Sequence, residues 1–178
     1  LTFTRIRYGG SFGSPSIDLS QADIHMSDSI VEFAAGPAVN LASNSNPILA
    51  NCTLNSTAFA IANAPITALA GLSGLSASGN ASGDYLQITS TAFTGNLTLP
   101  IAATPNQSGV FVLNAGFSVA SGSSLTLLPG TIIKVSGNFT HTFNGPLFAQ
   151  GTPTAPIVFT TFTDDVFGGD TNKNGLSN

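Results

Sequence analysis

Two stretches in the second half of the chain decide the fold: residues 117–135 read FSVASGSSLTLLPGTIIKV, and residues 147–175 read LFAQGTPTAPIVFTTFTDDVFGGDTNKNG. In both, short runs in which apolar and polar residues alternate are separated by turns rich in Gly, Pro, Asn and Asp. A period of two is typical of short β-strands, and no sustained 3.6-residue period indicates a helix. The sequence therefore predicts an all-β fold.

Apolar positions also recur at a longer interval of about 22 residues. In the second half, Leu125 and Leu147 are 22 residues apart, and Val112, Ile133 and Ile157 are 21 and 24 apart. Three further series repeat the interval in the first half: Leu19, Leu41 and Ile61; Val31, Leu54 and Leu75; Ile24, Ile48 and Ile66. Three short strands in each such period are what a right-handed parallel β-helix requires, because each coil stacks on the previous one.

We therefore expect one β-solenoid domain over residues 1–178, with about eight coils stacked about 4.8 Å apart. The stretch 71–83 (GLSGLSASGNASG) is rich in small turn residues, which favours a loop excursion between solenoid halves 1–70 and 84–178. No segment has the pattern of a capping helix: Leu1 to Thr4 read directly as strand, and residues 172–178 read as a polar loop.

Composition excludes several classes of function. Charged residues are only 7 % of the chain, with four basic and eight acidic residues and a net charge of −4, so no basic patch exists for nucleic acid. Hydrophobic residues make up 42 %, well above the level of a disordered chain. No apolar run approaches the roughly 20 residues of a membrane helix, so no membrane insertion is expected.

The chain begins at Leu1 without Met and without a secretion signal, which indicates a processed chain or a fragment. Cys52 is the single cysteine, so no intramolecular disulfide can form. A buried free thiol and an intermolecular bridge are the two interpretations of Cys52, and the first is favoured.

The two quoted stretches resemble secreted bacterial right-handed β-helix repeat proteins, in which a GxxLTxxPGTxxK coil leads to a GT…APIxFTSxxDDxxGGDTNxDG segment. Residues 6–10 (IRYGG) and Pro47-Ile48 are similar to later coils of the same proteins, so the resemblance covers most of the chain outside residues 71–100. It implies this fold and an extracellular or cell-surface location. In those proteins a segment like 147–175 leads onward into coils like 1–10, so the sequence reads as one repeat of a continuous β-helix.

A β-helix with uncapped ends carries unpaired strand edges, and contacts that translate without closing produce filaments. We therefore expect a structural subunit of an extracellular filament that polymerises head to tail with copies of itself. Residues 1–8 and 164–178 are the expected junction, with six apolar contacts: Leu1, Phe3, Ile6, Tyr8, Phe162 and Phe167. The alternative is a module of a larger cell-surface adhesin or carbohydrate-binding β-helix protein.

A calcium site is predicted near the end of the chain. Residues 170–175 (DTNKNG) match the first half of a calcium loop, with side-chain oxygens at positions 1, 3 and 5 and a Gly for the turn. The carboxylate at position 12 is missing, and either Asp164 or Asp165 could supply it by folding back, or a neighbouring subunit could supply it. The candidate ligands are Asp164, Asp165, Asp170, Asn172 and Asn174, and the alternative is an Asx-rich turn without metal.

No pattern of catalytic residues is recognisable, so we expect no enzyme. The remaining acids lie at different turns of a coil, and His141 alternates with Phe residues as a partly buried, hydrogen-bonded histidine would. Carbohydrate binding has little support, because Trp is absent and Tyr occurs only twice. Six N-x-S/T sequons are candidate glycosylation sites: Asn51, Asn55, Asn80, Asn96, Asn106 and Asn138.

Overall fold

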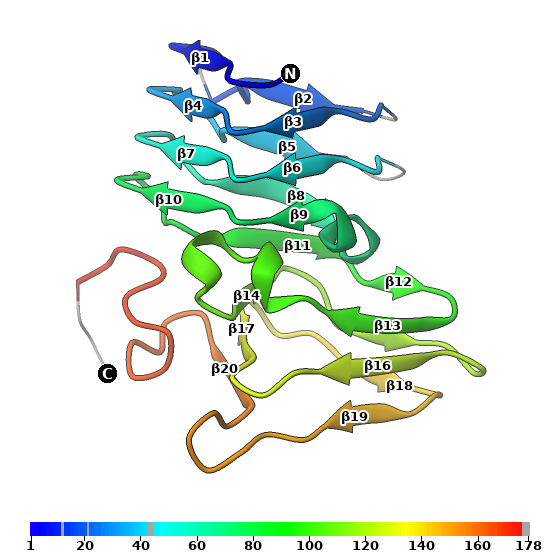
Figure 1. Cartoon of the computed structure of the whole chain (residues 1–178). Coiled ribbons are helices and arrows are strands. Elements are labelled where there is room, and N and C mark those ends of the chain that lie inside the picture. Colours follow the sequence, from blue (N-terminus) through cyan, green and yellow to red (C-terminus); the bar gives the residue numbers. More distant parts are fainter. Residues whose placement is uncertain (12, 21, 43–44, 176–178) are drawn as a thin grey trace.

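Short parallel strands stack into a β-helix (Figure 1). The computed structural model describes residues 1–11, 13–20, 22–42 and 45–175. Every pairing between these strands is parallel and joins strands one turn apart, so the fold class expected from the sequence is confirmed. The longest sheet has seven strands, one fewer than the roughly eight coils expected, because several segments of the chain lie outside the strands.

One sheet, the seven-stranded sheet, runs the whole length of the stack. Its strands are β2 (Ile17–Leu19), β5 (Val39–Leu41), β8 (Ile61–Pro65), β11 (Leu86–Ser90), β14 (Val110–Leu113), β17 (Ile132–Val135) and β20 (Val158–Thr161).

The other four sheets each occupy only part of the stack. Two belong to the first half. One contains β1 (Arg5–Arg7), β4 (Ile30–Glu32), β7 (Thr53–Asn55) and β10 (Ser76–Ser78). The other contains β3 (His25–Ser27), β6 (Ile48–Ala50) and β9 (Leu72–Ser73). Two belong to the second half. One contains β12 (Ala92–Phe93), β15 (Ser118–Val119) and β18 (Thr142–Phe143). The other contains β13 (Asn96–Leu99), β16 (Ser124–Leu127) and β19 (Leu147–Ala149).

The core consists of columns of apolar side chains, one from each turn. The central column of the seven-stranded sheet is formed by paired residues in every turn: Ile17, Val39, Ile61, Leu86, Phe111, Ile133 and Phe159. Its five middle members are fully buried. Because parallel in-register strands place like positions above one another, each column buries apolar surface continuously along the stack.

The cross-section of the β-helix changes in the middle of the chain. Three short 3-10 turns lie there: η1 (Ile66–Gly71), η2 (Ile101–Ala103) and η3 (Pro105–Gln107). Asn106 ends the β1–β10 sheet, since its side-chain amide accepts from the N–H of Ala77 at 3.0 Å and donates to the carbonyl oxygen of Ala77 at 2.8 Å. The amide thereby takes the place of a further strand along β10.

The prediction of a loop excursion at residues 71–83 is wrong. That segment contains β9 and β10, which continue two sheets of the first half in regular parallel register. Between its small turn residues the segment supplies Leu72, Leu75 and Ala77 to the core, so composition gave a misleading signal. The stretches that depart from the strand pattern are η1 before it and residues 101–107 after it.

Cys52 lies in the interior of the stack and is a free, fully buried thiol. Its Sγ donates to the carbonyl oxygens of Met26 at 3.5 Å and Ala50 at 3.4 Å, and burial raises its pKa. The interpretation of Cys52 as a buried free thiol is confirmed.

Candidate functional site

The first end of the β-helix exposes strand edges. Among the described residues, β1 and β2 each pair on one side only, with β4 and β5. The first two residues lie on β3, where the Leu1 ammonium donates to the carbonyl oxygen of His25 at 2.7 Å and Thr2 bridges Ser27. The three 3-10 turns lie mid-stack, and Figure 1 shows β1 and β2 as the outermost strands.

The second end exposes the last strands of three sheets, β18, β19 and β20, each of which pairs on one side only within the described residues. The apolar columns end there on side chains that are 39 %, 37 % and 48 % exposed: Phe143, Leu147 and Phe159. Each pairs with a fully buried residue of the preceding turn: Val119, Leu125 and Ile133. Apolar side chains with a covered inner side and a bare outer side form a surface suited to receiving another coil.

The predicted junction residues fall into two groups. Leu1, Phe3 and Tyr8 are exposed at the first end, and Ile6 begins the column that continues through Val31. The prediction that Phe162 and Phe167 extend the opposite end is not matched by their placement. Phe162 packs against the Tyr85 ring with centroids 5.4 Å apart, and Phe167 follows it on a segment that runs back along the stack.

That returning segment, residues 162–175, is fastened on the outside of the seven-stranded sheet by Lys134. The Lys134 side chain is fully buried, and its Nζ donates to the carbonyl oxygens of Asp164 at 2.7 Å and Gly169 at 2.8 Å. Burial lowers the pKa of Lys134, while the carboxylates of Asp164, Asp165 and Asp170 oppose that shift. An apolar cluster beneath the segment includes Tyr85, Val110 and Val112.

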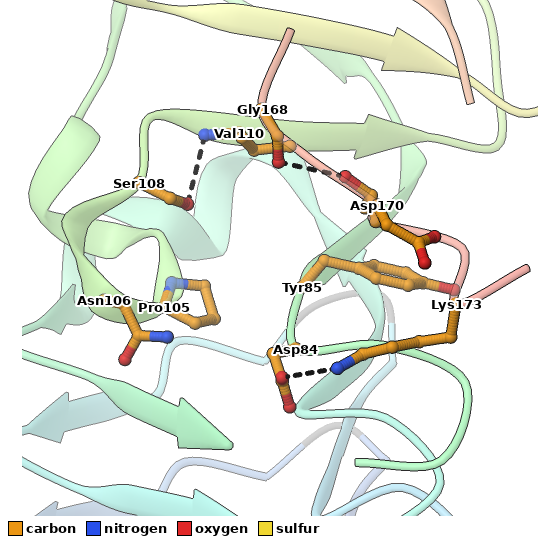
Figure 2. Close-up of a pocket in the computed structure, with 10 residues that line it drawn as sticks. Asp84, Tyr85, Pro105, Asn106, Ser108, Val110, Gly168, Asp170 and Lys173 are labelled. Carbon is orange, nitrogen blue, oxygen red and sulfur yellow. Dashed lines mark hydrogen bonds and ion pairs between the residues drawn. The ribbon is translucent and has the colours of Figure 1, made fainter. Parts of the chain in front are cut away.

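The returning segment also lines a small, half-open pocket of about 180 Å³ against the start of β11 and β14 (Figure 2). Lys173 forms an ion pair with Asp84 at 3.1 Å across it, and burial raises the pKa of Tyr85 to about 12. Asp84 also accepts from the backbone and side-chain nitrogens of Asn80, at 3.0 and 2.8 Å. The charged groups are thus already engaged in holding the segment.

The predicted calcium ligands lie in this segment, where the side-chain oxygens of three of them accept hydrogen bonds from the protein itself. Asp170 accepts backbone N–H groups from Asn174 at 3.2 Å and Gly175 at 3.1 Å, and Asn172 accepts the same Asn174 N–H at 3.3 Å. Asp164 accepts from the Thr160 hydroxyl and from the Val166 N–H; the first of these bonds is the main reason that its pKa is lowered.

Asp165 is nearly buried. Over residues 1–11, 13–20, 22–42 and 45–175, no three His, Cys, Asp or Glu side chains are grouped to hold a metal. Calcium binding therefore stays a prediction, and predicted junction residues 176–178 lie outside the described part of the chain.

One predicted glycosylation site is wrong for the folded chain. Asn80 is only 2 % exposed, and its Nδ2 donates to the carbonyl oxygen of Leu54 and to Asp84. A glycan attaches through that nitrogen, which here has no access to solvent. The other sequons have partly or fully exposed Asn residues: Asn51, Asn55, Asn96, Asn106 and Asn138.

His141 is partly buried, and its Nδ1 accepts the backbone N–H of Phe117 at 3.1 Å, as the alternating pattern around it predicts. Sequence reasoning missed the residues that define the two ends, Ile17 and Phe159, and the anchor Lys134. Ile17 and Phe159 could have been identified by following one column of paired residues along the seven-stranded sheet. That requires the correct pairing of every strand between them.

Comparison of the chain with protein-family models, with curated proteins and with solved structures finds no match. Among the described residues, no helix has the length and apolar character needed to cross a membrane.

Proposed function

We propose that this protein is a structural subunit of an extracellular filament and that it assembles head to tail by stacking the second end of one copy on the first end of the next. The observation that carries this proposal is the central column of the seven-stranded sheet. It ends on Phe159, which is 48 % exposed, and begins on the partly buried Ile17. Stacking would continue the column from copy to copy.

These two ends offer two contributions to a stable contact, unpaired strand edges and exposed apolar side chains. The unpaired N–H and C=O groups of β2 and β20 are strand edges that accept a further strand. Covering a half-exposed Phe or Leu contributes about 1 kcal/mol for each side chain. Because the two faces differ, the contact is heterologous, and repetition of the same step gives an open filament rather than a closed ring.

The extracellular location rests on the resemblance to secreted β-helix repeat proteins. Calcium is proposed as a ligand of the returning segment, through Asp170 and its neighbours, where it would stabilise the segment rather than form the contact between copies.

A module of a larger adhesin or carbohydrate-binding protein is a second candidate, supported by one exposed aromatic pair. The rings of Tyr8 and Phe33 stack with centroids 5.4 Å apart, and the Arg7 guanidinium lies 5.2 Å from both. Tyr8 is 72 % exposed, and such rings stack on the apolar faces of sugars. In that case the open ends would meet neighbouring coils of the same polypeptide.

Negative-stain electron microscopy and sedimentation velocity of the purified chain test the proposal. We expect unbranched fibres one subunit wide that lengthen with protein concentration, because end contacts follow mass action. Fibres should survive chelation of calcium, while the returning segment should become easier to cleave by protease. Monomers at every concentration, with and without calcium, would overturn the filament and favour the adhesin module.

A further inference from the structure

We infer that copies join through β20 of one and β2 of the next in a single register, with Phe159 beside Ile17. This register brings Asp18 close to Asp164 of the neighbouring copy, and the repulsion between the two carboxylates weakens assembly. We call this repulsion the charge brake. This inference rests on the proposed end-to-end function and specifies its contact.

The seven-stranded sheet alone has an outermost strand at both ends of the described structure. The β1–β10 sheet stops mid-stack at the Asn106 amide, and the sheet of β3 stops at β9. The sheets of β18 and β19 begin mid-stack, at β12 and β13. Continuation of the same sheet from one copy to the next is therefore available only between β20 and β2.

Alternation of side chains fixes the register between these two strands. Ile17 and Leu19 face the core, with Asp18 between them on the outside. On β20, Phe159 ends the core column, and Thr160 lies in line with Lys134 on the outer face. A slip by one residue would turn Asp18 into the apolar interior, which is strongly unfavourable. Pairing Phe159 with Ile17 places Thr160 beside Asp18.

Asp18 ends a ladder of side-chain hydrogen bonds on that outer face. Asn63 donates through Nδ2 to Oδ1 of Asn40 at 2.7 Å, and Asn40 donates in the same way to Oδ1 of Asp18 at 2.7 Å. Each Asn both accepts and donates, so the ladder could continue indefinitely through amides. A carboxylate has no hydrogen to donate, so Asp18 stops the ladder at the first end.

The neighbouring copy brings a second carboxylate to this point. Thr160 donates its hydroxyl to Asp164, which holds that carboxylate beside the outer face of β20. Paired parallel strands lie about 4.8 Å apart, so Asp18 would lie beside Thr160 and one hydrogen bond further from the Asp164 carboxylate, close enough for the two negative charges to repel. Lys134 attracts the Asp164 carboxylate and offsets part of this repulsion, but its Nζ binds the backbone oxygens of Asp164 and Gly169, and it lies on β17, one strand further from the contact than Thr160. The contact therefore combines an attractive core with a repulsive outer pair.

Replacing Asp18 by Asn tests this inference. The variant keeps the acceptor for Asn40, removes one charge, and adds a donor that can reach Thr160 or Asp164 of the neighbouring copy. Asp28→Asn is a matched control: it makes the same change in net charge, and Asp28 also accepts from an Asn, Asn51 at 3.2 Å, but outside the seven-stranded sheet.

The readout is the association constant of the purified chains, measured by sedimentation at low salt (about 10 mM) and high salt (about 300 mM). We expect Asp18→Asn to strengthen association about tenfold at low salt, and much less at high salt where charges are screened. Asp28→Asn should change it less than about twofold. Equal effects of both substitutions, or none from Asp18→Asn while the wild type assembles, would overturn the charge brake but leave the filament intact. Failure of all three chains to assemble at either salt concentration would overturn the filament, and the brake with it.

Discussion

Replacement of Phe159 by Asp is expected to abolish end-to-end assembly without unfolding the chain. In the stacked contact the new carboxylate would lie in the apolar core between Ile133 of its own copy and Ile17 of the next. Burying a charge without a partner costs several kcal/mol, so the association constant should fall at least about 100-fold. In the free chain the same carboxylate can turn to solvent, because residue 159 is already half exposed.

Phe148→Asp is the control for this substitution. Phe148 is 51 % exposed and lies on β19 of the same end, but it pairs with Thr126 on the outward face rather than ending a core column. Sedimentation velocity should show monomers for Phe159→Asp and polymers for Phe148→Asp, and both variants should keep the β-sheet circular dichroism of the wild type. Polymers of wild-type length formed by Phe159→Asp would remove Phe159 from the contact.

Lys134→Met is expected to release the returning segment and to lower the free energy of unfolding by about 2 kcal/mol. Met keeps the apolar stem but leaves the carbonyl oxygens of Asp164 and Gly169 without the charged donor that each now has. Amide hydrogen exchange across residues 164–175 should accelerate strongly. Lys173→Met, which removes a partly exposed ion pair with Asp84, should cost less than about 1 kcal/mol.

Replacing Lys134 by Met should also change how the free energy of unfolding depends on pH. Because burial lowers the pKa of Lys134, the unfolded chain binds a proton that the folded chain has lost at pH values between the lowered pKa and the ordinary 10.5. Stability of the wild type should therefore rise with pH across that window, relative to Lys134→Met. An identical pH profile for the two chains, or unchanged exchange in residues 164–175, would contradict the anchoring role of Lys134.

The repeat of about 22 residues was sufficient to predict the class of fold, and parts of the register were correct. Leu125 pairs with Leu147 and Val31 with Leu54, as the spacing predicts. In the series of Val31, Leu54 and Leu75, the residue that pairs with Leu54 is Ala77 rather than Leu75. The pairing of the strands sets the register, and it need not place the largest apolar residue opposite Leu54.

The series of Val112, Ile133 and Ile157 was wrong for a physical reason. Ile133 pairs with Phe111 and Phe159, whereas Val112 pairs with Lys134 on the outer face. All four residues of β14 are buried because the returning segment covers that outer face. A strand buried on both faces loses its alternation, so the sequence alone could not show which side faced the core.

The same returning segment limits how much of the candidate site could be predicted. Tyr8 is named from the sequence as a junction residue, and its ring is exposed at the first end. The path of residues 162–175 depends on contacts with Lys134 and Asp84, which are far away in sequence and carry no local signal. Phe162 and Phe167 therefore lie on the returning segment rather than on β20, the last strand of the core.

Cross-linking with the double variant Ile17→Cys, Phe159→Cys tests the central claim most directly. The two positions end opposite sides of one column within a chain, so they can meet only between copies. Paired parallel strands bring α-carbons about 4.8 Å apart, within the range that a disulfide spans, and the buried Cys52 should not interfere. Mild oxidation is expected to give a ladder of covalent dimers, trimers and longer chains, which Ile17→Cys, Phe148→Cys should not give. Monomers alone from the first pair, under conditions in which the wild type sediments as polymers, would contradict stacking of β20 on β2.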